Sequence, residues 1–266
     1  MGDKYFDINC MYGKWPYSKL HYETAEGLSA AMQGAGIYKA VSARIEAYRY
    51  HHSENSSLIK DLAGYGDILP CFILTPHVPG EEGFRDIDEK VADISKKGVG
   101  FVRLYPVTNG FSLEEWCCGS LYSALEKHNI ALLLHFKELA RESSANEIAD
   151  KIFRICSNHP KLQIIILTFR HNNNRLIYRL MEACSNLFFD ISFFGVYRQL
   201  EDIVKRYGSS HLLFGTNMPF FEPGRVICLL KYADVSDADK EAIAYGNAEN
   251  LLSRSVEMSG TMPEVE

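Results

Sequence analysis

The sequence lacks the features that define several large classes of protein. No apolar run approaches the ~20 residues needed to cross a bilayer. The opening MGDKYFDINC carries charged residues and has no apolar stretch typical of a signal peptide. No cluster of Lys and Arg offsets the formal net charge of −6, which argues against a nucleic-acid-binding protein. We therefore expect a cytoplasmic protein with neither a membrane nor a nucleic-acid partner.

Two further absences concern cysteine and glycine. The seven cysteines are an odd number and include no Cys-x-x-Cys pair, so free, mostly buried thiols are favoured over a disulfide framework or a zinc knuckle. No glycine-rich phosphate loop follows any of the predicted strands, which makes a nucleotide-binding fold of the open-sheet type a weak alternative.

Apolar runs alternate with amphipathic segments along the chain. Ile130–Phe136, IALLLHF, has the pattern of a strand buried on both faces, and its polar residue comes only at the end. The predicted strands are Tyr5–Cys10, Ile37–Ala43, Ile68–Thr75, Val99–Tyr105, Ile130–Phe136, Leu162–Phe169, Leu187–Phe193 and His211–Phe214. The predicted helices are Thr24–Gln33, Ser56–Gly64, Phe84–Lys97, Ser112–Lys127, Ser144–Ser157, Arg175–Cys184, Leu200–Tyr207 and Asp237–Leu252.

This alternation predicts an α/β protein of a specific kind. Eight strands separated by helices, without a linker rich in Pro, Gly or Ser, indicate a single-domain (β/α)8 TIM barrel over residues 1–253. Residues 254–266 are polar and predict a flexible tail. Ser112 and Glu115 have the spacing of a capping box at the start of one helix. An open, doubly wound sheet has the same local pattern and is the main alternative.

Polar side chains gather where the predicted strands end. In a barrel these ends form one mouth, and residues two apart on a strand share a face, as do Arg103 and Tyr105. Arginine side chains there suit a small anionic ligand. The strand-end residues are Asn9, Met11, Arg44, Glu46, Thr75, His77, Arg103, Tyr105, His135, Thr168, Arg170, His171, Asp190, Ser192 and Asn217.

The chain resembles the amidohydrolase superfamily, in its amidohydrolase-related branch of metal-dependent TIM-barrel hydrolases. The resemblance rests on stretches that follow one another in the family's order over nearly the whole chain. These are FDINCMYG, GVGFVRLYP, IALLLHF, HPKLQIIILTFRH, NLFFDIS, HLLFGTNMPF and AIAYGNAENLL. The last two are the most specific.

The resemblance implies a metal held by His-x-His on the first strand, one histidine on each of strands five and six, and an aspartate on strand eight. In this chain the first-strand pair becomes Asn9 and Met11, and the aspartate becomes Asn217. His135 is retained, whereas the strand-six histidine falls near Phe169, with His171 two residues later. Asn cannot act as a general base, and Met binds hard divalent ions poorly, so no metal cofactor is expected.

Three hypotheses remain open. The first is a metal-independent hydrolase of a small carboxylated substrate such as a lactone. The second is an inactive barrel that binds a small ligand or a partner protein. The third is a metal hydrolase, for example with zinc, whose site is rearranged around His135, His171 and Asp190. The predicted catalytic residues are His135, Asn217 and Asp190, and the predicted substrate-binding residues are Asn9, Arg103, Tyr105, Arg170 and His171. Assembly into a homo-oligomer is also left open.

Overall fold

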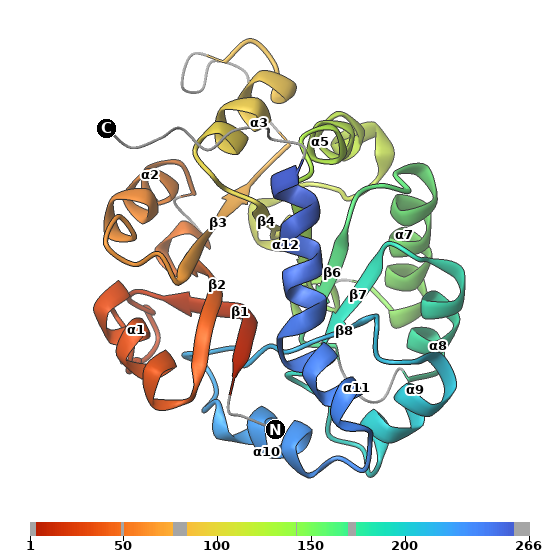
Figure 1. Ribbon diagram of the computed structural model, residues 1–266. Helices are drawn as coiled ribbons and strands as arrows, with labels where there is room; N and C mark the ends of the chain where they lie inside the picture. Colours follow the sequence, from red (N-terminus) through yellow and green to blue (C-terminus); the bar gives the residue numbers. More distant parts are fainter. Residues whose placement is uncertain (1–3, 49–50, 77–83, 142, 170–173, 258–266) are drawn as a thin grey trace.

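Eight parallel strands form one sheet in the order β1 to β8 in the computed structural model, which describes residues 4–48, 51–76, 84–141, 143–169 and 174–257 (Figure 1). The strands are β1 (Tyr5–Tyr12), β2 (Ile37–Arg44), β3 (Ile68–Leu74), β4 (Phe101–Leu104), β5 (Ala131–His135), β6 (Ile164–Leu167), β7 (Leu187–Asp190) and β8 (Leu212–Leu213). Each lies within about two residues of its predicted start, because long apolar runs are strong strand signals.

Backbone hydrogen bonds between β1 and the segment after β8 close the sheet into a barrel. The amide of Ile8 donates to the carbonyl oxygen of Phe214 at 3.0 Å, and the amide of Met11 donates to Met218 at 2.9 Å. The predicted single-domain (β/α)8 barrel is therefore confirmed, and an open, doubly wound sheet is excluded.

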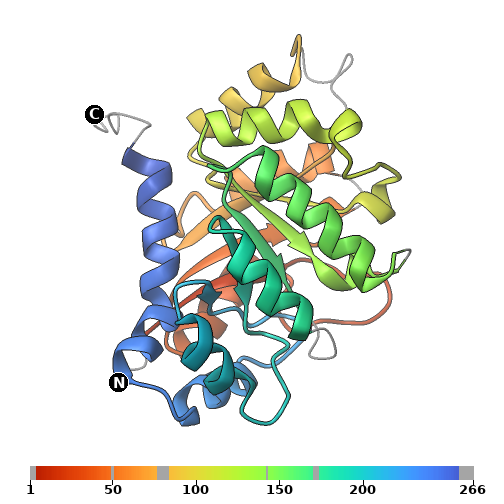
Figure 2. The same ribbon diagram turned by 90° about the vertical axis from the view of Figure 1, so that its right-hand side faces the viewer.

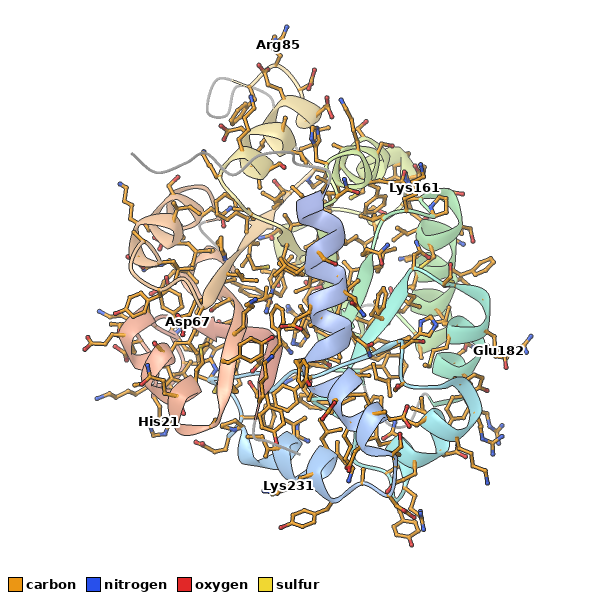
Figure 3. The ribbon with its side chains drawn as sticks, in the orientation of Figure 1. His21, Asp67, Arg85, Lys161, Glu182 and Lys231 are labelled. Carbon is orange, nitrogen blue, oxygen red and sulfur yellow. The ribbon has the colours of Figure 1, made fainter. Side chains whose placement is uncertain are left out.

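Helices surround the barrel, as Figures 1 and 2 show. The main helices are α1 (Ala25–Gly34), α2 (His51–Asp61), α3 (Ile87–Lys96), α5 (Glu115–Lys127), α7 (Ala145–Asn158), α8 (Asn174–Ala183), α9 (Gln199–Tyr207), α10 (Gly224–Tyr232) and α12 (Asn247–Glu257). Shorter pieces are η1 (Glu46–Tyr48), α4 (Pro106–Asn109), α6 (Phe136–Leu139), α11 (Asp237–Glu241) and η3 (Ala242–Gly246), the last a π-helical turn. Charged side chains such as Arg85, Lys161 and Glu182 lie at the periphery (Figure 3).

Strand alternation divides the core into two clusters of buried residues. Leu133 and Ile165 belong to the cluster inside the barrel, whereas their neighbours Leu134 and Ile166 pack in the cluster between the strands and the helices. Helix α12 adds Leu251 to the inner cluster and lies across one end of the barrel (Figure 1). The opposite end of the barrel, at the C-terminal ends of the strands, forms the mouth.

Several local predictions were wrong. Helix α5 begins at Glu115 without a side-chain cap, because the Ser112 hydroxyl accepts from the amide of Glu114 instead. The predicted helix Asp237–Leu252 is three consecutive pieces, and α10 was not predicted. Helix α2 begins at His51, five residues before the predicted start at Ser56. Helix α12 continues to Glu257, past the start of the predicted tail, and residues 258–266 lie outside the described chain.

Two other sequence-based expectations concern the whole chain. All seven cysteines are free, and all but Cys117 and Cys228 are buried, as predicted. Throughout the described segments, no helix is both long enough and apolar enough to cross a membrane.

Candidate active site at the barrel mouth

The barrel mouth contains a pocket of about 410 Å³. Its lining comes from strand ends and from the loops after them, namely Met11, Trp15, Ile45, Tyr48, Tyr105, His135, Lys137, Glu138, Arg141, Phe193, Asn217, Phe220 and Phe221. A volume in this range suits a small organic ligand. A larger groove of about 770 Å³ lies elsewhere and includes Trp116 and Lys151, but none of the predicted site residues lines it.

His135 ends β5 and is the histidine of this pocket. The hydroxyl of Thr168 lies 3.2 Å from each of its ring nitrogens, in reach of a hydrogen bond. Burial lowers the pKa of His135 to about 3, and the nearby charges of Arg103 and Lys137 act in the same direction. The imidazole is therefore neutral at pH 7 and can donate one hydrogen bond and accept another.

Thr168 occupies the strand-six position beside His135, where the sequence suggested Phe169. The backbone of Thr168 is left-handed, with φ of 56°, and its amide donates to the carboxylate of Asp190 at 2.8 Å. Phe169 is buried instead against Phe136 and Phe189, on the side of the helices. Arg170 and His171, two of the predicted binding residues, lie outside the described part of the chain.

Asp190 is fully buried beneath the mouth and does not line the pocket. Besides the Thr168 amide, it accepts from the Asn9 side chain at 2.8 Å and from the Ser192 hydroxyl at 2.7 Å. Burial raises its pKa to about 6, although these donors act in the opposite direction. Gly215 is required beside it, because an added Cβ would lie 2.8 Å from Asp190 Oδ2. This arrangement favours an orienting role over the predicted catalytic one.

Asn9 and Arg103, both predicted to bind substrate, also lie below the pocket. Asn9 is fully buried, and its Oδ1 has no hydrogen-bond partner among the described residues. Arg103 is buried inside the barrel and donates to the carbonyl oxygen of Cys10 at 3.1 Å. Neither position favours a direct contact with a ligand.

Asp7, which the sequence analysis did not single out, holds the segment after β8 against β1. Its carboxylate accepts from the amide of Asn9 at 2.9 Å, from the amide of Thr216 at 3.0 Å and from the Cys10 thiol at 2.9 Å. Burial raises the pKa of Asp7. These contacts lock the two ends of the barrel sheet together below the mouth.

Tyr105 and Asn217 do reach the pocket, as predicted. The Tyr105 ring packs edge-on against Tyr48, with ring centroids 4.5 Å apart. Asn217 follows β8 with a left-handed backbone, φ of 61°. Its backbone N–H donates to the backbone carbonyl oxygen of Asn9 at 2.9 Å. No described residue accepts from or donates to the Asn217 side chain, so it is available to a ligand.

The sequence analysis missed the ionisable residues of the segment that follows β5. Lys137 and Arg141 are exposed cations at the rim, and Glu138 is a buried carboxyl. Arg141 Nη1 donates to the Thr108 hydroxyl at 3.2 Å, and that hydroxyl also bonds to Tyr48. The i, i+3 spacing of His135 and Glu138 is the one sequence signal that could have connected these residues to the site.

Comparison with known proteins agrees with this architecture. The sequence matches the profile of the amidohydrolase family over residues 14–254. This chain belongs to the amidohydrolase family. A sequence search of curated proteins finds no match.

Several solved structures have the same fold as this chain at low sequence identity. An uncharacterised TIM-barrel protein from Bordetella bronchiseptica aligns with a TM-score of 0.73 and 16% identity over 95% of this chain and 99% of its own. The 5-carboxyvanillate decarboxylase of Sphingomonas paucimobilis gives 0.70 and 11% over 94% and 99%. A putative 2-pyrone-4,6-dicarboxylic acid hydrolase of Pseudomonas putida gives 0.69 and 14% over 95% and 98%. Such identities establish the fold alone.

The family implies a divalent metal, and manganese is bound in a related 5-carboxyvanillate decarboxylase from Novosphingobium aromaticivorans. In this chain the corresponding residues on strands one, five and eight are Asn9, Met11, His135 and Asn217, which offer two neutral amides, a thioether and one imidazole. His171, the candidate that follows strand six, lies outside the described residues. The described residues contain no group of three His, Cys, Asp or Glu that could hold a metal. Asn9 donates its Nδ2 to Asp190, and the oxygen that it could offer to a cation, Oδ1, is a neutral amide oxygen. This donor set fits a divalent metal poorly.

Proposed function

We propose that this amidohydrolase-family barrel hydrolyses a small carboxylated substrate, such as an aromatic lactone, without a metal ion. The observation that carries the proposal is the composition of the mouth pocket. Aromatic rings form its walls, two cations stand at its rim, and a neutral histidine faces a site whose family metal ligands are replaced.

The walls favour a flat, apolar ligand body. Trp15, Tyr48, Tyr105 and Phe220 contribute rings, and the Trp15 ring meets the Phe220 ring edge-on with centroids 5.4 Å apart. Aromatic rings in a pocket wall give a large apolar surface on which a planar ligand group can pack. The pocket volume of about 410 Å³ limits the ligand to one or two fused rings with short substituents.

The rim favours a negative charge on that ligand. Lys137 and Arg141 both line the pocket from the segment after β5. Arg141 is already oriented by the Thr108 hydroxyl, so less side-chain freedom is lost when its guanidinium binds a carboxylate. Related structures with this fold include enzymes named for carboxylated aromatic or pyrone substrates, which is consistent with the same class.

His135 would act as a neutral hydrogen-bond donor to the carbonyl oxygen of the scissile group. A pKa of about 3 makes its imidazole a weak base at pH 7, but a neutral imidazole can still polarise a carbonyl and stabilise the developing oxyanion. The hydroxyl of Thr168, 3.2 Å from the ring nitrogens, would orient the ring for that task.

The test is turnover of dihydrocoumarin, a carboxy-substituted dihydrocoumarin and the matching lactams, before and after treatment with a chelator. We expect hydrolysis of the carboxylated lactone, unaffected by the chelator, and a loss of about 100-fold or more in kcat/KM for His135→Ala. Ser42→Ala, which removes a buried hydroxyl outside the pocket, is the control for general damage to the barrel. Full activity of His135→Ala would contradict the proposed role.

A second function, ligand binding without catalysis, is favoured by one observation. Asn217 occupies the place of the family's strand-eight acid and presents an amide that cannot take up a proton. A carboxylated lactone that raises the melting temperature but is never hydrolysed would support this second function over the first.

A further inference from the structure

Glu138 is the acidic residue of the mouth pocket among the described residues, and its surroundings are unusual. The residue is only 5% exposed. One carboxyl oxygen, Oε1, accepts from the backbone amide of Thr108 at 2.7 Å. The other, Oε2, is buried and has no hydrogen-bond partner among the described residues. A buried acceptor without a partner is costly unless the site has a use for it.

The position of Glu138 in the chain places it beside His135. Helix α6 (Phe136–Leu139) starts directly after β5, so that His135 is its N-terminal cap residue and Glu138 is its third residue. Residues with this i, i+3 spacing lie on the same side of a helix. A Glu at that position usually bonds back to the amide of the cap residue. Here its carboxyl is drawn instead to Thr108 of α4, which fixes it in the pocket wall.

The same position in the next helix shows the ordinary arrangement. Glu147, the third residue of α7, accepts from the amide of Ser144 at 2.7 Å, while the Ser144 hydroxyl accepts from the Glu147 amide at 3.3 Å. Both residues lie at the surface. Glu147 therefore serves a structural cap, whereas the carboxyl of Glu138 bonds to Thr108 and Glu138 lines the mouth pocket.

We infer that Glu138 is the general base and acid of the proposed hydrolysis, with Oε2 as the atom that exchanges the proton. This inference rests on the proposed function and adds to it the proton-transfer group that His135 and Asn217 cannot supply. The carboxylate removes a proton from the attacking water as the oxygen of that water bonds to the lactone carbonyl carbon. The ring C–O bond then breaks, and Glu138 returns the same proton to the leaving oxygen. The products are the hydroxyl group and the new carboxyl group of the opened ring.

The charges around Glu138 support this role. Burial raises the pKa of Glu138, and the Thr108 amide and the guanidinium of Arg141 limit the rise. The other ionisable groups that line the same pocket are neutral His135, the exposed Lys137 and the phenols of Tyr48 and Tyr105. A carboxyl with a raised pKa is a stronger base once ionised, and it holds the transferred proton more readily until the leaving oxygen takes it up.

The experiment compares Glu138→Gln with the wild-type protein on the carboxylated dihydrocoumarin across pH. Because Gln keeps an oxygen for the Thr108 amide, we expect the melting temperature to change by only a few degrees. We expect kcat/KM to fall by about 100-fold or more and to lose its dependence on pH in the acidic range. Glu138→Asp should recover part of the activity. Glu147→Gln is the matched control and should keep the wild-type kcat/KM.

The outcomes separate this inference from the proposed function. Wild-type hydrolysis with an equally active Glu138→Gln would overturn the role of Glu138 and leave the hydrolase proposal intact. Absence of hydrolysis by the wild-type protein on every lactone and lactam would overturn both. Loss of activity together with unfolding of Glu138→Gln, and no recovery in Glu138→Asp, would show a purely structural carboxyl and also overturn the inference.

Discussion

The lowered pKa of the single side chain His135 makes the stability of the protein depend on pH. Its pKa is about 3 in the folded protein against an ordinary value of 6.5. Below pH 6.5 the unfolded chain takes up a proton that the folded protein does not. The free energy of unfolding is therefore unaffected by this group above pH 6.5. It decreases as the pH falls from 6.5 toward 3, by up to about 1.4 kcal/mol per pH unit.

Urea titrations of the wild-type protein and His135→Gln between pH 4 and 8 measure this effect. Below pH 6.5 we expect the wild-type protein to lose stability relative to His135→Gln. The difference between their free energies of unfolding should change by up to about 1.4 kcal/mol per pH unit. The difference isolates His135, because the raised pKa of Asp190 acts in the opposite sense in both proteins. Thr168→Val, beside His135 but not ionisable, should change stability by a constant amount. A constant offset for His135→Gln would contradict the prediction.

The positions of individual residues show why only part of the site could be predicted from the sequence. The rule that strand ends carry function found His135, Tyr105 and Asn217 in the pocket. It placed Arg103 there too, but β4 ends at Leu104, so Arg103 sits one side-chain layer deeper than Tyr105. The rule could not find Glu138, because this residue lies in α6, three residues past the end of β5.

Tertiary contacts decide how individual elements begin. Ser112 and Glu115 have the spacing of a capping box, as do Ser144 and Glu147, but only the second pair forms one. In the first pair the carboxylate of Glu115 bonds instead to the ring of the buried His159, at 3.1 Å. The local pattern is identical, and a partner 44 residues away determines the outcome.

This difference predicts unequal costs for two otherwise similar substitutions. Ser144→Ala removes a hydroxyl that accepts from the first turn of α7, and we expect a loss of about 1 kcal/mol in the free energy of unfolding. Ser112→Ala removes only an acceptor for the Glu114 amide before α5, and we expect less than about 0.5 kcal/mol. Chemical denaturation of the two variants provides the comparison. Equal losses would show that the capping box contributes nothing beyond the single hydroxyl.

The whole barrel was predictable because its signal is repeated eight times. Most strands are short, mainly apolar runs separated by helical segments, and errors of one or two residues at the boundaries do not change the topology. The chemistry is not repeated in this way. It depends on a few positions where the family carries metal ligands and this chain carries Asn9, Met11 and Asn217, so that the fold and the family leave the reaction open.

Metal binding is the property of the whole molecule that most directly tests this view. A site with a dissociation constant of 1 μM would, at 100 μM metal, stabilise the protein by about 2.7 kcal/mol and raise its melting temperature by roughly 5–10 °C. We expect a rise of less than about 1 °C with either zinc or manganese, because the donors at the mouth are amides, a thioether and one imidazole. Elemental mass spectrometry of the same samples should find less than stoichiometric metal. A larger rise that disappears in His135→Ala would instead establish a rearranged site that includes His135.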